Sequence, residues 1–322
     1  MHPAWRQWVD DNLTQGASPA EVVAGLVDEG FSAREALDTV EAVAAAASER
    51  MARIGRKLER LAALHRAQRR AAGHGIERVA GLSPEAFFAR YYATLTPVVI
   101  TDLVPRWAAF GRWSLDSLRA RFGQVEIAVA RGREADVDYD LHTARLSTLM
   151  PLGAYCDLIE SRGPTNDHYA VAQHHNSDRE GLAPLFDEVS MPDGWLDPAR
   201  RRGATALWIG PAATVTPLHH DTCNILFCSV LGQKRFTLAA PHETVLFAHQ
   251  RGCYSRLDPE RRDDPRVAAV DWLTVDLDAG EALYLPTGWW HHVRALSVSI
   301  NLAFTNFARA NAFDWYRPGE VV

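Results

Sequence analysis

The chain contains 322 residues, of which 47% are hydrophobic and 23% are charged, and its formal net charge is -6 at pH 7. These values are typical of a folded globular protein, so they exclude a disordered chain and a fibrous repeat. The acidic balance also argues against a surface devoted to nucleic acid.

The N-terminal residues 1–49 predict a module of three short helices. Ser18 is a suitable N-cap for the second helix, and Pro19 follows it at the first helical position. Ser32 is placed to cap the third helix, with Glu35 three residues later as in a capping box.

Residues 22–40, VVAGLVDEGFSAREALDTV, resemble the helix, Gly-Phe turn and helix of ubiquitin-associated-type modules. The resemblance implies a protein-binding module. The alternative is a helical cap that packs on the main domain.

Residues 50–80 predict a basic linker helix, because apolar residues recur at spacings of three and four among many Lys and Arg residues. A solvated connecting helix with one apolar stripe is the favoured interpretation. The alternatives are the seam of a homodimer or a contact with an acidic peptide or RNA.

From residue 81 to 322 the pattern changes to short segments rich in β-branched and aromatic residues, separated by turn residues. The predicted strands are PVVITD, VEIAVARG, HYAVAQ, TALWIG, NILFCSVLG, KRFTLAAP, WLTVDL, EALYLP and SVSINLAF. Helices are expected at residues 114–122 and 146–160. Many short strands favour a mainly β fold, with two facing sheets as in a jelly roll.

The segment TPLHHD, residues 216–221, lies in this β region. Successive side chains of a strand point to opposite faces, so His219 and Asp221 converge while His220 points away. A third ligand is expected from TGWWHHV, residues 287–293, as His291 or His292. Two histidines and one carboxylate are the donor set of non-haem Fe(II) oxygenases.

Lys234 lies on the predicted strand after the turn at Gly232, and most of the other residues of this segment have the apolar character of core residues. It shares its strand face with Phe236, so we expect Lys234 to point inward and Arg235 outward. A buried lysine needs an anionic partner, because an unpaired buried charge is costly.

Taken together, residues 82–322 resemble the JmjC-type branch of the cupin superfamily, in particular the cupin-like hydroxylases related to factor inhibiting hypoxia-inducible factor. The matching elements are PVVITDLVPRW, TPLHHD, LGQKRF, YSRLD and GEALYLPTGWWHHV followed by SVSINLAF. The resemblance implies a double-stranded β-helix with flanking helices.

By this resemblance, the catalytic iron ligands are His219, Asp221 and His291. The carboxylate of 2-oxoglutarate would be bound by Lys234, with further contacts from Thr216 and Tyr169.

Two asparagines are weaker matches to the family pattern. The asparagine expected six residues after the first histidine ligand is replaced by Ile225, and Asn224 lies one position earlier. Asn301 matches a late-strand asparagine near the cosubstrate, and Ala303 stands where relatives carry an aromatic residue. Asn224 and Asn301 are therefore included as cosubstrate contacts.

The function that the resemblance implies is an Fe(II)- and 2-oxoglutarate-dependent dioxygenase, which uses O2 to hydroxylate a side chain of a protein or peptide. Demethylation of a lysine uses the same chemistry. The alternatives are a hydroxylase of a free amino acid or other small metabolite and a non-catalytic metal-binding cupin.

Four cysteines are present without CxxC spacing, which indicates reduced thiols. No apolar run approaches the length that spans a membrane, and no signal-peptide pattern is present. We therefore expect a cytoplasmic protein with no membrane partner.

Overall fold

The computed structural model describes residues 1–322 except residues 72, 74 and 314–322, so the last residues of the predicted 81–322 domain lie outside the described part. The chain forms two compact units, Met1–Ala72 and Gly73–Val322. Each unit is described below on its own.

The first unit is helical and consists of α1 (Pro3–Thr14), α2 (Pro19–Asp28) and α3 (Ala33–Ala71). Its small core is formed by Val9, Val22, Leu26, Ala36 and Val40. A capping box joins Ser18 to Glu21 at the start of α2. The Ser32 hydroxyl accepts a hydrogen bond from the backbone N–H of Glu35 at 3.2 Å.

The third predicted helix and most of the predicted linker helix, residues 50–80, form one continuous helix of 39 residues that ends at Ala71. The end of the predicted linker helix is wrong, because Glu77–Val79 form a strand. Its later turns expose an apolar stripe, formed by Met51, Ile54, Leu58, Leu61 and Leu64. The favoured interpretation, a solvated connecting helix, and the alternative of a homodimer seam both stay predictions.

The second unit contains two six-stranded sheets and one three-stranded sheet. The first sheet has the strand order β1-β2-β13-β8-β15-β6. Its strands are β1 (Glu77–Val79), β2 (Val98–Ile100), β13 (Ala282–Leu285), β8 (Ile225–Leu231), β15 (Ser299–Phe304) and β6 (Thr205–Gly210).

The second sheet has the order β10-β11-β7-β14-β9-β12. Its strands are β10 (Gln250–Arg251), β11 (Tyr254–Ser255), β7 (Val215–His219), β14 (Trp290–Ala295), β9 (Lys234–Ala239) and β12 (Leu273–Leu277). From β6 to β9, and again from β12 to β15, each strand joins the opposite sheet from the strand before it. This alternation confirms the predicted double-stranded β-helix.

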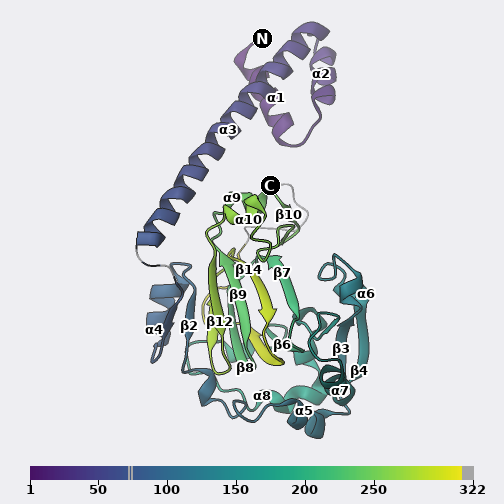
Figure 1. Ribbon diagram of the computed structural model, residues 1–322. Coiled ribbons are helices and arrows are strands. Elements are labelled where there is room, and N and C mark those ends of the chain that lie inside the picture. Colours follow the sequence, from purple (N-terminus) through teal and green to yellow (C-terminus); the bar gives the residue numbers. More distant parts are fainter. Residues whose placement is uncertain (72, 74, 314–322) are drawn as a thin grey trace. The chain divides into compact units, whose positions relative to one another are not determined.

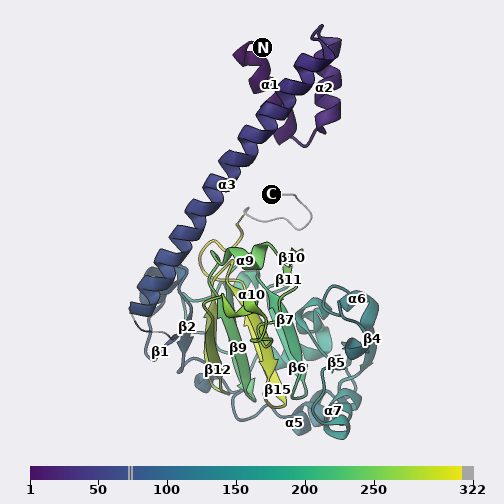
Figure 2. The ribbon, with the colours of Figure 1, turned by 45° about the horizontal axis from the view of Figure 1, so that its top comes forward.

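The two sheets lie face to face (Figures 1 and 2), and a core cluster draws residues from both of them. Phe227 and Leu283 come from the first sheet, whereas Phe236 and Val293 come from the second. A side chain that points inward from either sheet therefore lies in the layer between the two sheets.

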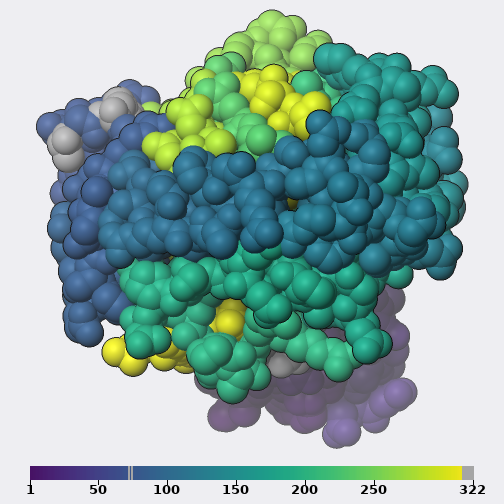
Figure 3. Space-filling view, turned by 90° about the horizontal axis from the view of Figure 1, so that it is seen from below, coloured from purple at the N-terminus to yellow at the C-terminus, as the bar shows by residue number. Residues whose placement is uncertain are grey.

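Helices pack against the outer sides of the sheets and at their ends. They are α4 (Pro84–Phe87), α5 (Leu115–Phe122), α6 (Thr143–Leu146), α7 (Leu152–Arg162), α8 (Ala183–Phe186), α9 (Thr244–Phe247) and α10 (Pro265–Ala268). Seen from below, segments coloured blue to green form a continuous surface over one end of the sheets (Figure 3). Among the described residues, no helix is long and apolar enough to span a membrane.

One predicted helix is partly a strand. Residues 146–160 were expected to be helical, but Ser147–Pro151 form β4, which pairs with β3 (Glu126–Arg131), and α7 begins at Leu152. Pro151 explains the boundary, since a proline ring is tolerated at a helix start and not inside the helix. The third strand of this small sheet is β5 (His168–Tyr169).

Candidate metal centre and adjoining cavity

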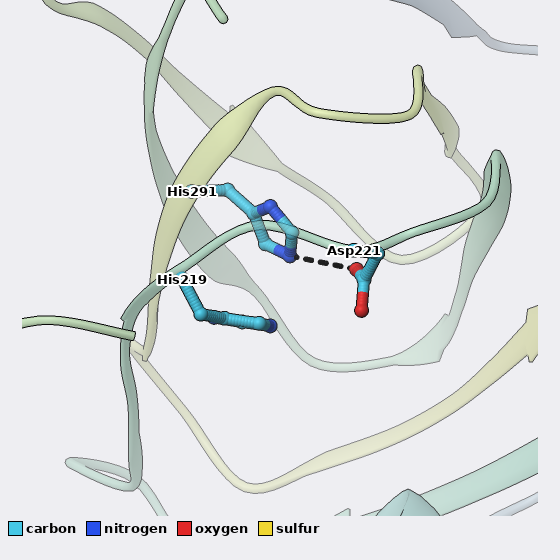
Figure 4. A group of neighbouring side chains, drawn as sticks. All are labelled: His219, Asp221 and His291. Carbon is cyan, nitrogen blue, oxygen red and sulfur yellow. Dashed lines mark ion pairs between the residues drawn. The ribbon is translucent and has the colours of Figure 1, made fainter. Parts of the chain in front are cut away.

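Three possible metal ligands meet at the ends of β7 and β14. His219 and His291 are directly paired across the two strands, and Asp221 follows the end of β7. His291 Nε2 lies 3.3 Å from Asp221 Oδ2 (Figure 4). One ligand atom from each of the three residues lies within 4.8 Å of the others, so the group could hold a metal ion.

The backbone fixes the orientation of both imidazole rings. His219 Nδ1 lies 2.7 Å from the carbonyl oxygen of Pro217, and His291 Nδ1 lies 2.9 Å from that of Trp289. A carbonyl oxygen can only accept, so each Nδ1 is the donor. The lone pair of each neutral ring is therefore on Nε2, the tautomer that a metal ligand needs.

The surroundings favour neutral His219 and ionised Asp221. Burial, reinforced by His291, lowers the pKa of His219 to about 4. Burial would raise the pKa of Asp221, but its contact with His291 and the neighbouring imidazoles outweigh this and lower it to about 2. Neutral imidazole and ionised carboxylate are the forms that bind metal ions.

A β-bulge brings Thr216 to the same side as His219. In the β7–β14 pair, His291 is opposite His219 and Val293 is opposite Thr216, so β7 contains one extra residue between these positions. Pro217 lies within this stretch, and it cannot donate to the ladder. Strict alternation would place Thr216 and His219 on opposite faces, but both line the same cavity.

The neighbouring histidines point elsewhere. His220 is buried and packs edge-on against the Trp290 ring, with centroids 4.7 Å apart. His292 lines a different cavity, together with Glu260 and Arg294. The structure thus brings His291, and not His292, to His219 and Asp221.

The candidate metal centre opens into a cavity of about 420 Å³, which also contains Lys234, Tyr169 and Thr216. Lys234 is only 2% exposed, and its ammonium group donates a hydrogen bond to the Tyr169 hydroxyl. Arg235 is exposed and pairs with Asp276 at 2.7 Å. Lys234 therefore points inward, as the strand pattern predicted.

No carboxylate neutralises Lys234 within this cavity, since Asp221 is the only acidic residue among the described residues that line it. Burial and the positive charge of Arg133 lower the pKa of Lys234 to about 7. A carboxylate ligand would supply the missing negative charge. The cavity therefore fits a molecule that has a carboxylate at one end and metal-binding oxygens at the other.

The two asparagine expectations need correction. The side-chain oxygen of Asn224 accepts hydrogen bonds from the Tyr284 hydroxyl at 2.8 Å and from the Thr287 backbone N–H at 2.9 Å. Its amide nitrogen donates to Asn311 at 2.9 Å. Asn224 does not line the cavity, because these contacts hold its side chain between β8, β13 and the C-terminal segment.

Asn301 is fully buried on β15 and also lies outside the lining of the cavity. Its amide nitrogen donates to the Ser229 hydroxyl at 3.2 Å. Ala303, two residues later on the same strand, does line the cavity.

Several lining residues were not predicted from the sequence, notably Trp208 and Tyr254. Trp208 could have been found from the alternation of β6, where Ala206 and Trp208 share a face. Tyr254 pairs with His219 through β11, a two-residue strand too short to recognise from its sequence.

Arg133 was also missed, although it is only 1% exposed and lies behind the cavity. Its guanidinium lies 5.2 Å from the Tyr169 ring and donates to the Val215 carbonyl oxygen at 2.7 Å. It is therefore placed to support both Tyr169 and β7.

Comparison with known proteins agrees with this architecture. The family model of the cupin-like domain matches residues 84–311. The "Lysine-specific demethylase JMJ30" of Arabidopsis thaliana is 30% identical over 239 residues, which cover 71% of this chain and 54% of that protein. The "Jumonji C domain-containing protein 5" of Drosophila melanogaster is 29% identical over 236 residues, covering 69% of this chain and 57% of that protein.

The "Bifunctional peptidase and (3S)-lysyl hydroxylase JMJD7" of Homo sapiens is 25% identical over 244 residues, covering 66% of this chain and 77% of that protein. This chain thus spans little more than half the length of the first two relatives.

Proposed function

Because the chain belongs to the cupin-like domain family, we propose that it is an Fe(II)- and 2-oxoglutarate-dependent dioxygenase that hydroxylates a side chain of a protein or peptide. One observation carries the proposal: a single cavity contains a His-Asp-His group and a buried lysine that has no carboxylate partner among the described lining residues. A metal-binding cupin without turnover would have no need for that lysine.

In this proposal His219, Asp221 and His291 hold the iron. Two imidazoles and one carboxylate on one side of a metal leave other coordination positions open, as non-haem Fe(II) oxygenases require. The fixed Nδ1–H groups of both histidines orient the ligands before the metal binds, which raises metal affinity.

Lys234 binds the carboxylate of 2-oxoglutarate that is remote from the iron, through a charge-assisted hydrogen bond. Tyr169 and Thr216 each contribute a hydroxyl group to this part of the cavity. The Tyr169 hydroxyl is hydrogen-bonded to Lys234, and Thr216 is brought there by the bulge of β7. These residues orient the cosubstrate, and the apolar walls of the cavity exclude water.

When bound, Fe(II) and 2-oxoglutarate supply the oxidising chemistry, in which O2 converts 2-oxoglutarate to succinate and CO2 and hydroxylates the substrate. The protein's own contribution is to hold Asp221 ionised, to keep His219 neutral, to orient both imidazole rings and to admit one substrate side chain.

A protein or peptide substrate is supported by the names of relatives, which describe a lysyl hydroxylase and a lysine-specific demethylase. A cytoplasmic location is supported by the four cysteines, all of which are free thiols.

The test is O2-dependent formation of succinate from 2-oxoglutarate by the Fe(II)-loaded protein, with and without protein extracts as substrate. We expect succinate release that Asp221→Ala abolishes and that a protein extract stimulates. Stimulation by free amino acids alone would favour a small-molecule hydroxylase. No succinate release under any condition would contradict the proposal.

A further inference from the structure

The cavity lining contains few charged side chains. Among its described lining residues, Asp221 is the only acidic one and Lys234 is the only lysine or arginine. Asp221 lies 3.3 Å from His291 within the possible metal group, so it is not available to a substrate. A cationic side chain that enters this cavity would therefore find no carboxylate partner.

The loaded centre would not supply one either. This step rests on the proposed function: the positive charges of a divalent ion and Lys234 are matched by the negative charges of Asp221 and a dicarboxylate. No excess negative charge remains to attract a lysine or arginine.

Aromatic rings are the other way to hold a cation, but the rings here are already engaged. Lys234 Nζ lies 5.0 Å from the ring centre of Tyr169, 5.8 Å from Trp208 and 5.5 Å from Phe227. These three rings thus surround the protein's own cation and leave no cage for a methylated ammonium group.

The two remaining aromatic residues of the lining are committed to other contacts. Phe236 packs edge-on against Phe227, with ring centroids 5.1 Å apart. Tyr254 stacks on His219 at 5.4 Å. Both rings line the cavity, but each is already in contact with a neighbouring ring of the protein.

The other lining residues include uncharged side chains, among them Gln173, Cys223, Cys253, Ala303 and Thr305. We propose that the cavity selects an uncharged substrate side chain and rejects lysine and arginine in their cationic forms. The physical reason is that burying an unpaired charge costs far more than burying an amide that can bond to the polar groups present. This chain would then differ in substrate class from relatives whose names specify lysine.

Matched peptide pairs test this directly. Each pair keeps the same randomised flanking positions and differs only at the central residue: lysine against acetyl-lysine, and arginine against citrulline. Binding is measured without O2, from the change in visible absorption of the Fe(II) and 2-oxoglutarate complex. Hydroxylation is then measured by mass spectrometry after O2 is added.

We expect the uncharged member of each pair to bind about a hundredfold more tightly, the scale set by an unpaired buried charge. Equal binding of both members, or tighter binding or hydroxylation of the lysine or arginine member, would overturn the inference. Failure of the proposed function is a separate result, because the absorption band would then be absent before any peptide is added.

Gln173→Glu provides the reciprocal variant. Gln173 is exposed and lines the cavity, so an isosteric carboxylate there leaves the fold intact and adds a counter-charge. We expect this variant to improve binding of the lysine peptide relative to its acetylated partner, while Gln173→Met does not. The same preference in both variants would contradict a selection based on charge.

Discussion

His291 and His219 face each other across the β7–β14 ladder, with their ring centroids 4.1 Å apart. Each ring is held by a carbonyl oxygen two residues before it in the chain. The candidate metal centre is therefore organised by the backbone of two paired strands, and Asp221 completes it just beyond the end of β7.

This pairing predicts different effects for the two adjacent histidines of β14. His291→Ala removes a ligand and should weaken Fe(II) binding by at least about a hundredfold, more than the loss of a supporting contact usually costs. His292→Ala, the matched control, should retain Fe(II) affinity, because His292 lines another cavity. Metal titration of both purified variants measures this, and a larger loss in His292→Ala would show that the ligand is misassigned.

The buried Lys234 predicts a pH dependence of cosubstrate binding. Its pKa is lowered to about 7 in the free protein by burial and Arg133, and a bound dicarboxylate would raise it. At a pH between the pKa of Lys234 in the free protein and its pKa in the complex, cosubstrate binding takes up a proton. The affinity for 2-oxoglutarate should therefore be constant below pH 7 and fall by up to about tenfold per pH unit above pH 7.

Calorimetry at pH 8 in buffers of different ionisation enthalpy measures the proton uptake. Lys234→Arg is the control, because arginine stays charged and should bind without taking up a proton. Cosubstrate binding at pH 8 with no proton uptake by the native protein would place the carboxylate away from Lys234.

Asn224 should matter for stability more than for cosubstrate binding. Asn224→Leu leaves the Tyr284 hydroxyl and the Thr287 N–H without their acceptor and removes the side-chain hydrogen bond to Asn311, so it should lower the free energy of unfolding by about 2–4 kcal/mol. Thr216→Val, which alters a cavity residue, should weaken 2-oxoglutarate binding more than Asn224→Leu does. Denaturant unfolding and cosubstrate titration compare the two, and the reverse order of affinities would restore Asn224 to the site.

The sequence predicted the double-stranded β-helix and the convergence of His219 with Asp221, because both follow from strand alternation. Strand alternation did not decide whether His291 or His292 is the third metal ligand, since the alternation after Trp290 depends on where β14 begins. Geometry resolves the choice through the direct pairing of His291 with His219.

Other features depend on irregularities that no alternation rule contains. Thr216 reaches the cavity only because β7 has a bulge beside Pro217. Asn224 was placed near the cosubstrate by its position in the chain, but hydrogen bonds to distant residues hold it elsewhere. Arg133 and Tyr254 reach the site through segments distant in sequence from TPLHHD. Arg133 lies in no recognised motif, and Tyr254 begins the matching element YSRLD, which did not reveal its pairing with His219.

The central claim is that one cavity binds Fe(II) and 2-oxoglutarate together. Anaerobic addition of both to the metal-free protein tests it most directly, since chelation of Fe(II) by 2-oxoglutarate gives a visible charge-transfer band. We predict this band in the native protein and in His292→Ala, and its loss in Asp221→Ala and His291→Ala. No band in the native protein, or an undiminished band in Asp221→Ala, would contradict the account.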